Sequence, residues 1–166
     1  MDITFSEVRN DDDLRILADL ASTIWHEYFP GIITDLQVDY MVEKYQSYDA
    51  VRQQITKGYE YYFVVEYGYV LGYIGILCEA EKLFLSKLYL KKEYRGKGVF
   101  NAMLAFCEEE ARSRGLNAMY LTVNRQNAPA VAVYRKKGFQ IVAEKKADIG
   151  NGFFMDDYVM EKSLVK

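Results

Sequence analysis

The sequence predicts a mixed α/β fold, in which a mostly antiparallel sheet of about seven strands carries helices on both faces. The first observation behind this prediction is that segments rich in β-branched and aromatic residues alternate along the chain with segments of helical periodicity. The second is their order, which is strand, helices, three strands, helix, strand, helix and two strands. With 166 residues, 51% of them apolar, the chain is expected to form a single domain over residues 1–166.

The N-terminal third is predicted to hold one strand and three helices. Residues 3–9 alternate as a strand does, and Asn10 can then cap a helix whose first turn is acidic. This helix is expected to end at residues 29–31, which read Phe-Pro-Gly. Residues 36–48, rich in tyrosine, and residues 49–57 are predicted as two further helices.

The middle of the chain is predicted to form an antiparallel meander followed by a helix. Residues 59–67 and 69–79 are joined across Tyr67-Gly68, which is typical of a hairpin, and residues 82–92 continue as a third strand. From residue 99 to 114 the pattern becomes helical. Its expected apolar stripe consists of Phe100, Met103, Leu104, Cys107 and Ala111.

The C-terminal part is predicted to hold a short buried strand at residues 119–123, a helix and two more strands. Asn127 is a suitable cap for that helix, and Gly138 can close it. The last two strands, residues 139–145 and 154–161, flank a glycine-rich turn.

Composition narrows the class of protein. No stretch reaches the roughly 18 apolar residues of a membrane helix, and the N-terminus has no apolar signal segment, so a cytoplasmic protein without a membrane partner is expected. Cys78 and Cys107 lie in apolar segments and are predicted to be reduced core thiols. His26, the one histidine, is predicted to lie on a helix surface, and no metal site is expected.

Charge is divided unevenly along the chain. Residues 1–80 hold 14 Asp and Glu against 5 Lys and Arg, a net charge of −9, whereas residues 81–166 hold 10 against 16, a net charge of +6. A basic half suits a polyanionic ligand and an acidic half a cationic one, although both can also be ordinary solvated surface. The acidic overall balance and the lack of a long basic run argue against nucleic acid as a partner.

The segment most informative about function runs from a buried strand through Arg95, Gly96, Lys97 and Gly98 directly into a helix. The free N–H groups and the positive dipole end of such a helix attract an anion, and glycine lets the backbone approach a phosphate closely. Ordinary turn chemistry is the alternative. A P-loop is excluded because its motif is absent, and a dinucleotide fingerprint would need glycine at Asn101.

Two segments resemble motifs of the GNAT superfamily of acetyltransferases. LYLKKEYRGKGVFNAML is similar to motif A of that family, and NRQNAPAVAVYRKKGF, about 30 residues later, is similar to its motif B. The order of strands and helices from Tyr59 to the C-terminus also matches. The resemblance implies an acyl-CoA N-acyltransferase fold and an acetyl-CoA-dependent N-acetyltransferase. It also makes a homodimer one expectation, since family members often form one.

The resemblance further implies which residues bind the coenzyme. The backbone of Leu88, Tyr89 and Leu90 is expected to hold the pantetheine arm. The pyrophosphate is expected on Arg95, Gly96, Lys97, Gly98, Val99, Phe100 and Asn101. Asn124, Asn127 and Ala130 are expected to contact the rest of the coenzyme. Tyr134 is expected to touch it as well and to protonate the departing thiolate, with a core aromatic as the alternative.

Two positions depart from the family pattern. Phe100 stands where the family has glycine or alanine, so its side chain must point away from the pyrophosphate or weaken coenzyme binding. Ser86 stands where many members carry a glutamate that takes a proton from the amine. No base is assigned, because the sequence does not choose among the carboxylates and a water chain. These carboxylates are Glu27, Glu79, Glu81, Asp156 and Asp157.

The acceptor is expected at the N-terminal helices, where acidic residues accompany aromatic ones such as Trp25, Tyr28 and Phe29. Charge and ring faces together can hold a cation, and the layout is loosely similar to bacterial polyamine N-acetyltransferases. Packing of these rings against the sheet is an equal alternative. The expected activity is acetylation of a small cationic primary amine. Acetylation of a protein or peptide, or a non-catalytic CoA-binding regulatory domain, are the alternatives.

Overall fold

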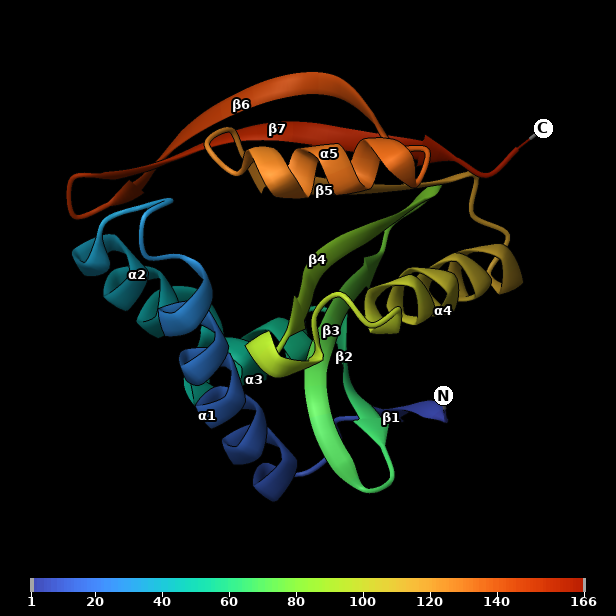
Figure 1. Ribbon diagram of the computed structural model, residues 1–166, viewed down its shortest axis with the longest axis horizontal. Coiled ribbons are helices and arrows are strands. Elements are labelled where there is room, and N and C mark those ends of the chain that lie inside the picture. Colours follow the sequence, from blue (N-terminus) through green and yellow to red (C-terminus); the bar gives the residue numbers. More distant parts are fainter. Residues whose placement is uncertain (1, 166) are drawn as a thin grey trace. The chain divides into compact units, whose positions relative to one another are not determined.

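The computed structural model describes residues 2–165 and contains a seven-stranded sheet with the strand order β1-β2-β3-β4-β5-β7-β6 (Figure 1). The strands are β1 (Ile3–Glu7), β2 (Tyr59–Glu66), β3 (Tyr69–Cys78), β4 (Lys82–Leu90), β5 (Ala118–Asn124), β6 (Gln140–Gly150) and β7 (Phe153–Ser163). The helices are α1 (Asp11–Tyr28), α2 (Asp35–Met41), α3 (Tyr48–Thr56), α4 (Val99–Ser113) and α5 (Ala128–Lys136), with a π-helix η1 (Val42–Gln46) and a 3-10 turn η2 (Lys92–Tyr94). The predicted fold class is confirmed.

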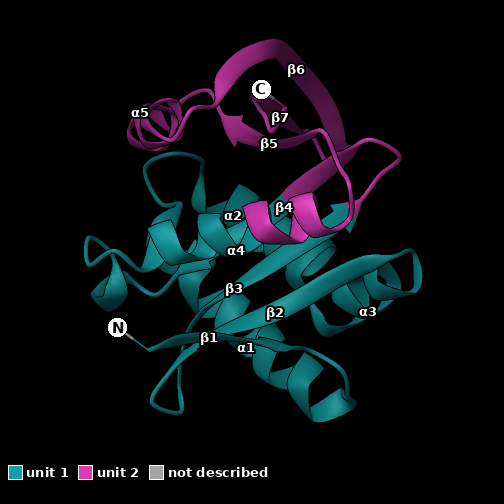
Figure 2. Ribbon diagram, turned by 90° about the vertical axis from the view of Figure 1, so that its right-hand side faces the viewer, with its two compact units in different colours: residues 1–77, 86–107 teal, residues 78–85, 108–166 magenta. Residues whose placement is uncertain are grey.

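These elements group into two compact units (Figure 2). Unit 1 comprises residues 1–77 and 86–107, and unit 2 comprises residues 78–85 and 108–166. Both β4 and α4 run from one unit into the other. The single domain expected from the sequence stays a prediction.

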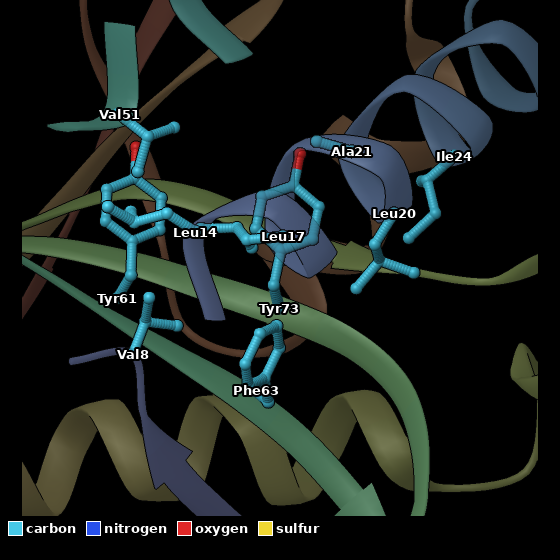
Figure 3. Close-up of a cluster of buried hydrophobic side chains, with 10 residues drawn as sticks. All are labelled: Val8, Leu14, Leu17, Leu20, Ala21, Ile24, Val51, Tyr61, Phe63 and Tyr73. Atoms are coloured by element: carbon cyan, nitrogen blue, oxygen red, sulfur yellow. The ribbon is translucent and has the colours of Figure 1, made fainter. Parts of the chain in front are cut away.

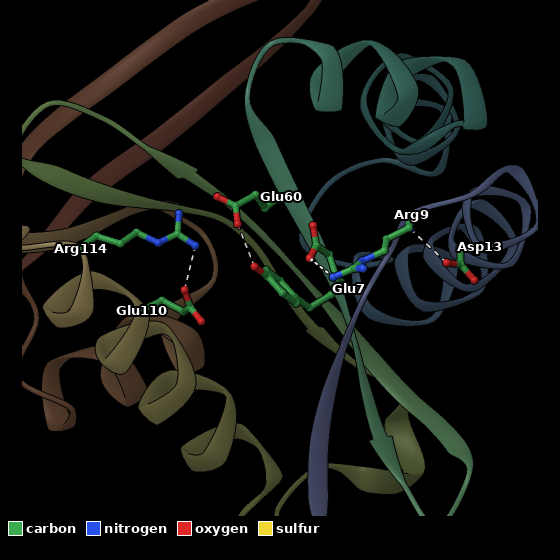
Figure 4. A network of polar contacts seen from close by, with 7 residues as sticks. Glu7, Arg9, Asp13, Glu60, Glu110 and Arg114 are labelled. Carbon is green, nitrogen blue, oxygen red and sulfur yellow. Dashed lines mark hydrogen bonds and ion pairs between the residues drawn. The ribbon is translucent and has the colours of Figure 1, made fainter.

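The core of unit 1 lies between α1, α3 and one face of the strands (Figure 3). Helix α1 begins where predicted, because the side chain of Asn10 accepts a hydrogen bond from the backbone N–H of Asp13 at 2.9 Å. Arg9 adds to this start, since its N–H donates to Asp13 and its guanidinium to Glu7 (Figure 4). The buried side chains are Val8, Leu14, Leu17, Leu20, Ala21, Ile24, Val51, Tyr61, Phe63 and Tyr73.

Helix α4 packs on the opposite face of the same strands. Its Phe106 ring stacks on Phe5 with centroids 4.3 Å apart and meets the edge of Tyr62 at 5.0 Å. Helices therefore cover both faces of the strands of unit 1, as the sequence predicts. Of the predicted stripe, Met103, Leu104, Cys107 and Ala111 are buried and Phe100 is half-buried, and the neighbouring Val99 is buried as well.

The predicted hairpin is confirmed, with φ values of 49° at Tyr67 and 80° at Gly68. The helical stretch predicted near residues 36–48 is confirmed as far as Gln46, but the type of helix changes within it. Helix α2 ends at Met41, and the next five residues form the π-helix η1. Hydrogen bonds from outside η1 fix this geometry, because Tyr73 Oη donates to Gln46 at 2.9 Å and Gln54 Nε2 donates to the carbonyl of Tyr45 at 3.1 Å.

Unit 2 is built on the antiparallel strands β5, β7 and β6, with α5 starting at the Asn127 cap. Its last two strands are longer than predicted, at 11 residues each. An ion pair from Arg114 to Glu110 supports the end of α4 (Figure 4). Cys107 is buried as predicted, but Cys78 is exposed, because it is the last residue of β3 and follows the buried part of that strand. None of the helices in residues 2–165 is long and apolar enough to span a membrane.

Candidate active site

The turn before α4 has the backbone of an anion site. Gly96 and Gly98 have φ values of 72° and 84°, which only glycine adopts without strain, and a side chain at Gly96 would meet no atom within 4 Å. The helix that follows has no acidic residue in its first turn, so nothing there opposes its positive N-terminal end. This open turn fits the pyrophosphate of a coenzyme.

Arg95 and Lys97 play different parts in this turn. Arg95 Nε and Nη2 donate to the carbonyl of Leu90 at 3.1 and 2.9 Å, and its guanidinium lies over the ring of Tyr28 at 4.8 Å. Arg95 therefore ties the turn to the end of β4 and to α1. Lys97 is exposed and carries the positive charge of the turn into solvent.

The end of β4 presents one edge to β3 and leaves the other for a ligand. Tyr89 O lies against Gly72 of β3, and the N–H of Lys91 donates to Leu71 O at 2.9 Å. Because backbone groups alternate along a strand, those of Leu88 and Leu90 point to the other edge. An edge of this kind can hydrogen-bond the amides of an extended chain, as the pantetheine arm is.

The turn from β5 to α5 is shaped by two asparagines. Asn124 Oδ1 accepts from the N–H of Gln126 at 2.8 Å, and the buried Asn127 accepts from the N–H of Ala130 at 3.4 Å. The predicted coenzyme residues Asn124, Asn127 and Ala130 thus stand together in unit 2. The side chain of Asn127 caps α5 and that of Asn124 holds the turn before it, so the two asparagines orient the helix that carries Tyr134.

Tyr134 lies half-buried on α5, and its ring meets Phe139 edge-on at 5.6 Å. Helix α5 contains no fully buried residue. Tyr134 thus packs on the buried Phe139 and is not fully buried itself, and its catalytic role stays a prediction.

The three aromatic residues predicted to hold the acceptor differ in exposure. Trp25 and Phe29 are buried, with ring centroids 4.2 Å apart, and Trp25 also packs on Tyr89 at 5.5 Å. Trp25 and Phe29 therefore pack against other rings, which was the alternative to binding the acceptor. Tyr28 is half-buried and remains accessible beside Arg95.

A buried lysine is the feature that the sequence reading missed. Lys87 is 6% exposed, and its Nζ donates to Gln54 Oε1 at 2.7 Å and to the hydroxyl of Tyr61. Burial lowers the pKa of Lys87 to about 7. The signal was present in the strand period, because Leu83, Leu85 and Lys87 are alternate residues and the first two are plainly apolar.

The candidate residues fall into two groups. Unit 1 holds the strand end, the glycine turn and the aromatic residues of α1, and unit 2 holds Asn124, Asn127, Ala130 and Tyr134. Three features are compatible with a bound acyl-CoA. They are the open glycine turn, the free edge of β4, and the first turn of α4, which has no acidic residue.

Comparison with known proteins agrees with this chemistry. A family model described as the acetyltransferase (GNAT) family matches residues 21–139. The chain is 26% identical over 156 residues to a spermidine N(1)-acetyltransferase of Thermoplasma acidophilum, covering 91% of each. It is 29% identical over 83 residues to a putative ribosomal protein bS18-alanine N-acetyltransferase of Bacillus subtilis, covering 49% of this chain and 55% of that one.

A solved structure extends the likeness to three dimensions. The PaiA N-acetyltransferase of Thermoplasma acidophilum, crystallised with coenzyme A, matches with a TM-score of 0.78 and 25% identity over 98% of this chain and 99% of that one. The family model alone spans well over half of the sequence. The chain therefore belongs to the GNAT family of acetyltransferases, and it is an acyltransferase that uses acetyl-CoA.

Proposed function

We propose that this enzyme acetylates a primary amine of a small, polyamine-like cation by direct attack in a ternary complex. The observation that carries the proposal is the match to an enzyme named a spermidine N(1)-acetyltransferase, which covers 91% of both chains. Membership of an acetyltransferase family argues against the alternative of a non-catalytic CoA-binding domain.

Charge on the N-terminal helices supports a cationic acceptor. Glu27, Asp35, Asp39 and Glu43 are exposed, and they belong to the half of the chain with a net charge of −9. His26, exposed as predicted, pairs with Asp39 at 2.7 Å. An acidic face raises the local concentration of a polycation.

Ring faces add a second source of affinity on these helices. The half-buried Tyr28, Tyr40 and Tyr45 lie among the same acids. Their rings can hold an ammonium group, as Lys44 already illustrates by lying 5.5 Å from the centroids of both Tyr40 and Tyr45.

The proposed roles of the site residues follow from their geometry. Lys97 and the N–H groups at the start of α4 bind the pyrophosphate. The outward backbone groups of Leu88 and the N–H of Leu90 bind the pantetheine arm, since the Leu90 carbonyl already accepts from Arg95. A backbone N–H of the same strand end stabilises the developing oxyanion. Acetyl-CoA supplies the acetyl group as a thioester, and Tyr134 protonates the leaving thiolate.

A protein or peptide amine is the second candidate acceptor. The match to a putative ribosomal protein bS18-alanine N-acetyltransferase favours it, although that match covers only about half of each chain. The acidic face would then bind a basic peptide. The cytoplasmic location and the homodimer expected from the sequence stay predictions.

Release of free CoA measured against a panel of acceptors tests the proposal. The panel consists of spermidine, spermine, single amino acids and peptides with a free N-terminal alanine, each compared with acetyl-CoA alone. We expect the highest kcat/KM with a polyamine. A higher kcat/KM with the peptides would favour the second candidate, acetylation of a protein or peptide, over the first. If no acceptor raised CoA release above the acceptor-free rate, both candidate functions would be overturned.

A further inference from the structure

An acceptor amine of this class is protonated near neutral pH, so its proton must be removed before attack, by a group on the enzyme or through a chain of water molecules. Ser86, at the position where a glutamate is common, is half-buried and cannot do so. We propose that Asp157 of β7 is the base that accepts the proton of the acceptor ammonium. This inference rests on the proposed function, because it requires an amine acceptor.

The other carboxylates left open by the sequence are poorer bases. Glu27 and Glu81 are exposed to solvent, where an ion pair with the acceptor ammonium contributes little binding energy. Glu79 accepts a hydrogen bond from the hydroxyl of Tyr120. Asp156 is bound to Arg125 through Nε at 3.2 Å. Each of these four is therefore solvated or already engaged.

Asp157 points away from the ion pair made by its neighbour. The side chains of Asp156 and Tyr158 both contact Arg125, so the residue between them faces the other side of the strand. In the ladder, Asp157 lies directly opposite Asn124 of β5 and Lys145 of β6. The carboxylate thus stands on one face of unit 2, across from the residue that begins the turn to α5 and Tyr134.

The environment of Asp157 suits a proton acceptor. The residue is 7% exposed, and within residues 2–165 its carboxylate has neither a hydrogen bond nor an ion pair. Among the same residues, Trp25 Nε1 is the one side-chain polar atom that is both fully buried and without a hydrogen-bond partner. The oxygens of Asp157 also have no partner, so they must keep some exposure to solvent. Such a carboxylate can accept a proton without first losing another partner.

The burial of Asp157 and the charges around it also favour a role as proton acceptor. Burial raises the pKa of Asp157 to about 6, and the charge of Asp156 contributes to that rise, while Lys145 opposes the shift. The group is then ionised at neutral pH yet is a stronger base than a solvated carboxylate.

The proton balance of the step is simple. The acceptor R–NH3+ gives one proton to the carboxylate of Asp157, and the neutral amine attacks the acetyl carbon. The C–N bond forms, the C–S bond breaks, and the thiolate takes a proton from Tyr134. The nitrogen loses its second proton as it becomes an amide, and that proton restores Tyr134 through water. Asp157 then releases its proton to solvent.

The test compares Asp157→Asn with Asp156→Asn, using the polyamine that the acceptor panel selects. Near pH 7 we expect Asp157→Asn to lower kcat by about 100-fold or more, and Asp156→Asn to change it little. Without the base, the variant depends on amine that is already neutral, and this fraction rises about tenfold per pH unit. The deficit should therefore shrink about tenfold per unit as the pH is raised toward 9.

A structural role would give a different pattern. Equal activity of Asp157→Asn and the wild type near pH 7, or a deficit that stays constant with pH, would overturn the proposal. If Asp157→Asn does not fold, the pH dependence of the wild-type enzyme is the test. The proposal requires the kcat/KM of the wild type to decrease as the pH drops below the pKa of Asp157, about 6. Failure of the wild type with every amine would instead refute the proposed function itself, so the two failures are distinguishable.

Discussion

The guanidinium of Arg95 lies 4.8 Å from the centroid of the Tyr28 ring while it donates twice to the carbonyl of Leu90. This contact joins the end of α1, where the acceptor is expected, to the end of β4 and the turn proposed for the coenzyme. Since all three residues belong to unit 1, the link does not depend on the second unit.

Removing the ring of Tyr28 should loosen this turn. Tyr28→Leu loses a cation–π contact of about 0.5–1 kcal/mol, so we expect the Kd of acetyl-CoA to rise roughly threefold. Tyr28→Phe keeps the ring and should bind as the wild type does. Calorimetric titration with acetyl-CoA measures both variants, and equal affinities for the two would contradict the coupling.

Tyr134→Phe should lower kcat by about 100-fold while leaving the Kd of acetyl-CoA unchanged, because the ring and its packing on Phe139 remain and only the proton donor is lost. Tyr120→Phe is the matched control, since it removes a hydroxyl that binds Glu79 in the same unit. Stopped-flow measurement of CoA release gives kcat. Full activity of Tyr134→Phe would remove this tyrosine from the mechanism.

Local signals made most of the secondary structure predictable. The Asn10 cap, the Tyr67-Gly68 hairpin and the strand-turn-helix at Gly96 all depend on residues close in sequence, and each is found where expected. The π-helix at residues 42–46 was not predictable, because hydrogen bonds from Gln54 of the next helix and from Tyr73, which is distant in sequence, hold it.

The site was predictable only in part, for the same reason. Motif residues identified the glycine turn and Tyr134, but burial separates residues that look alike in sequence. Trp25 is buried and Tyr28 is not, although both are aromatic residues of one helix, and Asp157 is buried whereas Asp156 is ion-paired. Such differences arise from packing between elements and leave no mark on composition.

Lys87 should make stability depend on pH. In the unfolded chain the amine is protonated below its ordinary pKa of 10.5, whereas burial lowers the folded-state pKa to about 7. Between these values the unfolded state binds more protons, so the free energy of unfolding rises with pH, by up to about 1.4 kcal/mol per unit. Below about pH 7 this contribution is constant.

Lys87→Met should abolish that slope and raise stability near neutral pH. Urea unfolding at about pH 7 and about pH 9.5 measures the effect. Lys82→Met, which changes an exposed lysine bound to Glu161, should keep the slope. A slope unchanged in Lys87→Met would mean that the buried amine is charged in the folded protein.

Gly72 sets how closely β3 and β4 approach. A Cβ atom at this position would overlap Tyr89 O and lie 3.0 Å from Leu90 Cα, and both are backbone atoms that cannot rotate away. Gly72→Ala must therefore displace the strand end proposed to bind pantetheine. We expect a loss of about 3 kcal/mol in the free energy of unfolding and weaker acetyl-CoA binding together.

Gly68→Ala separates this clash from the general cost of replacing glycine. Its φ of 80° strains an alanine, but no atom lies within 4 Å of the added Cβ. This variant should lose only about 1–2 kcal/mol and should bind acetyl-CoA normally. If Gly72→Ala also kept its coenzyme affinity while losing stability, the position of β4 would matter for folding alone, and the backbone of Leu88 and Leu90 would not be the pantetheine site.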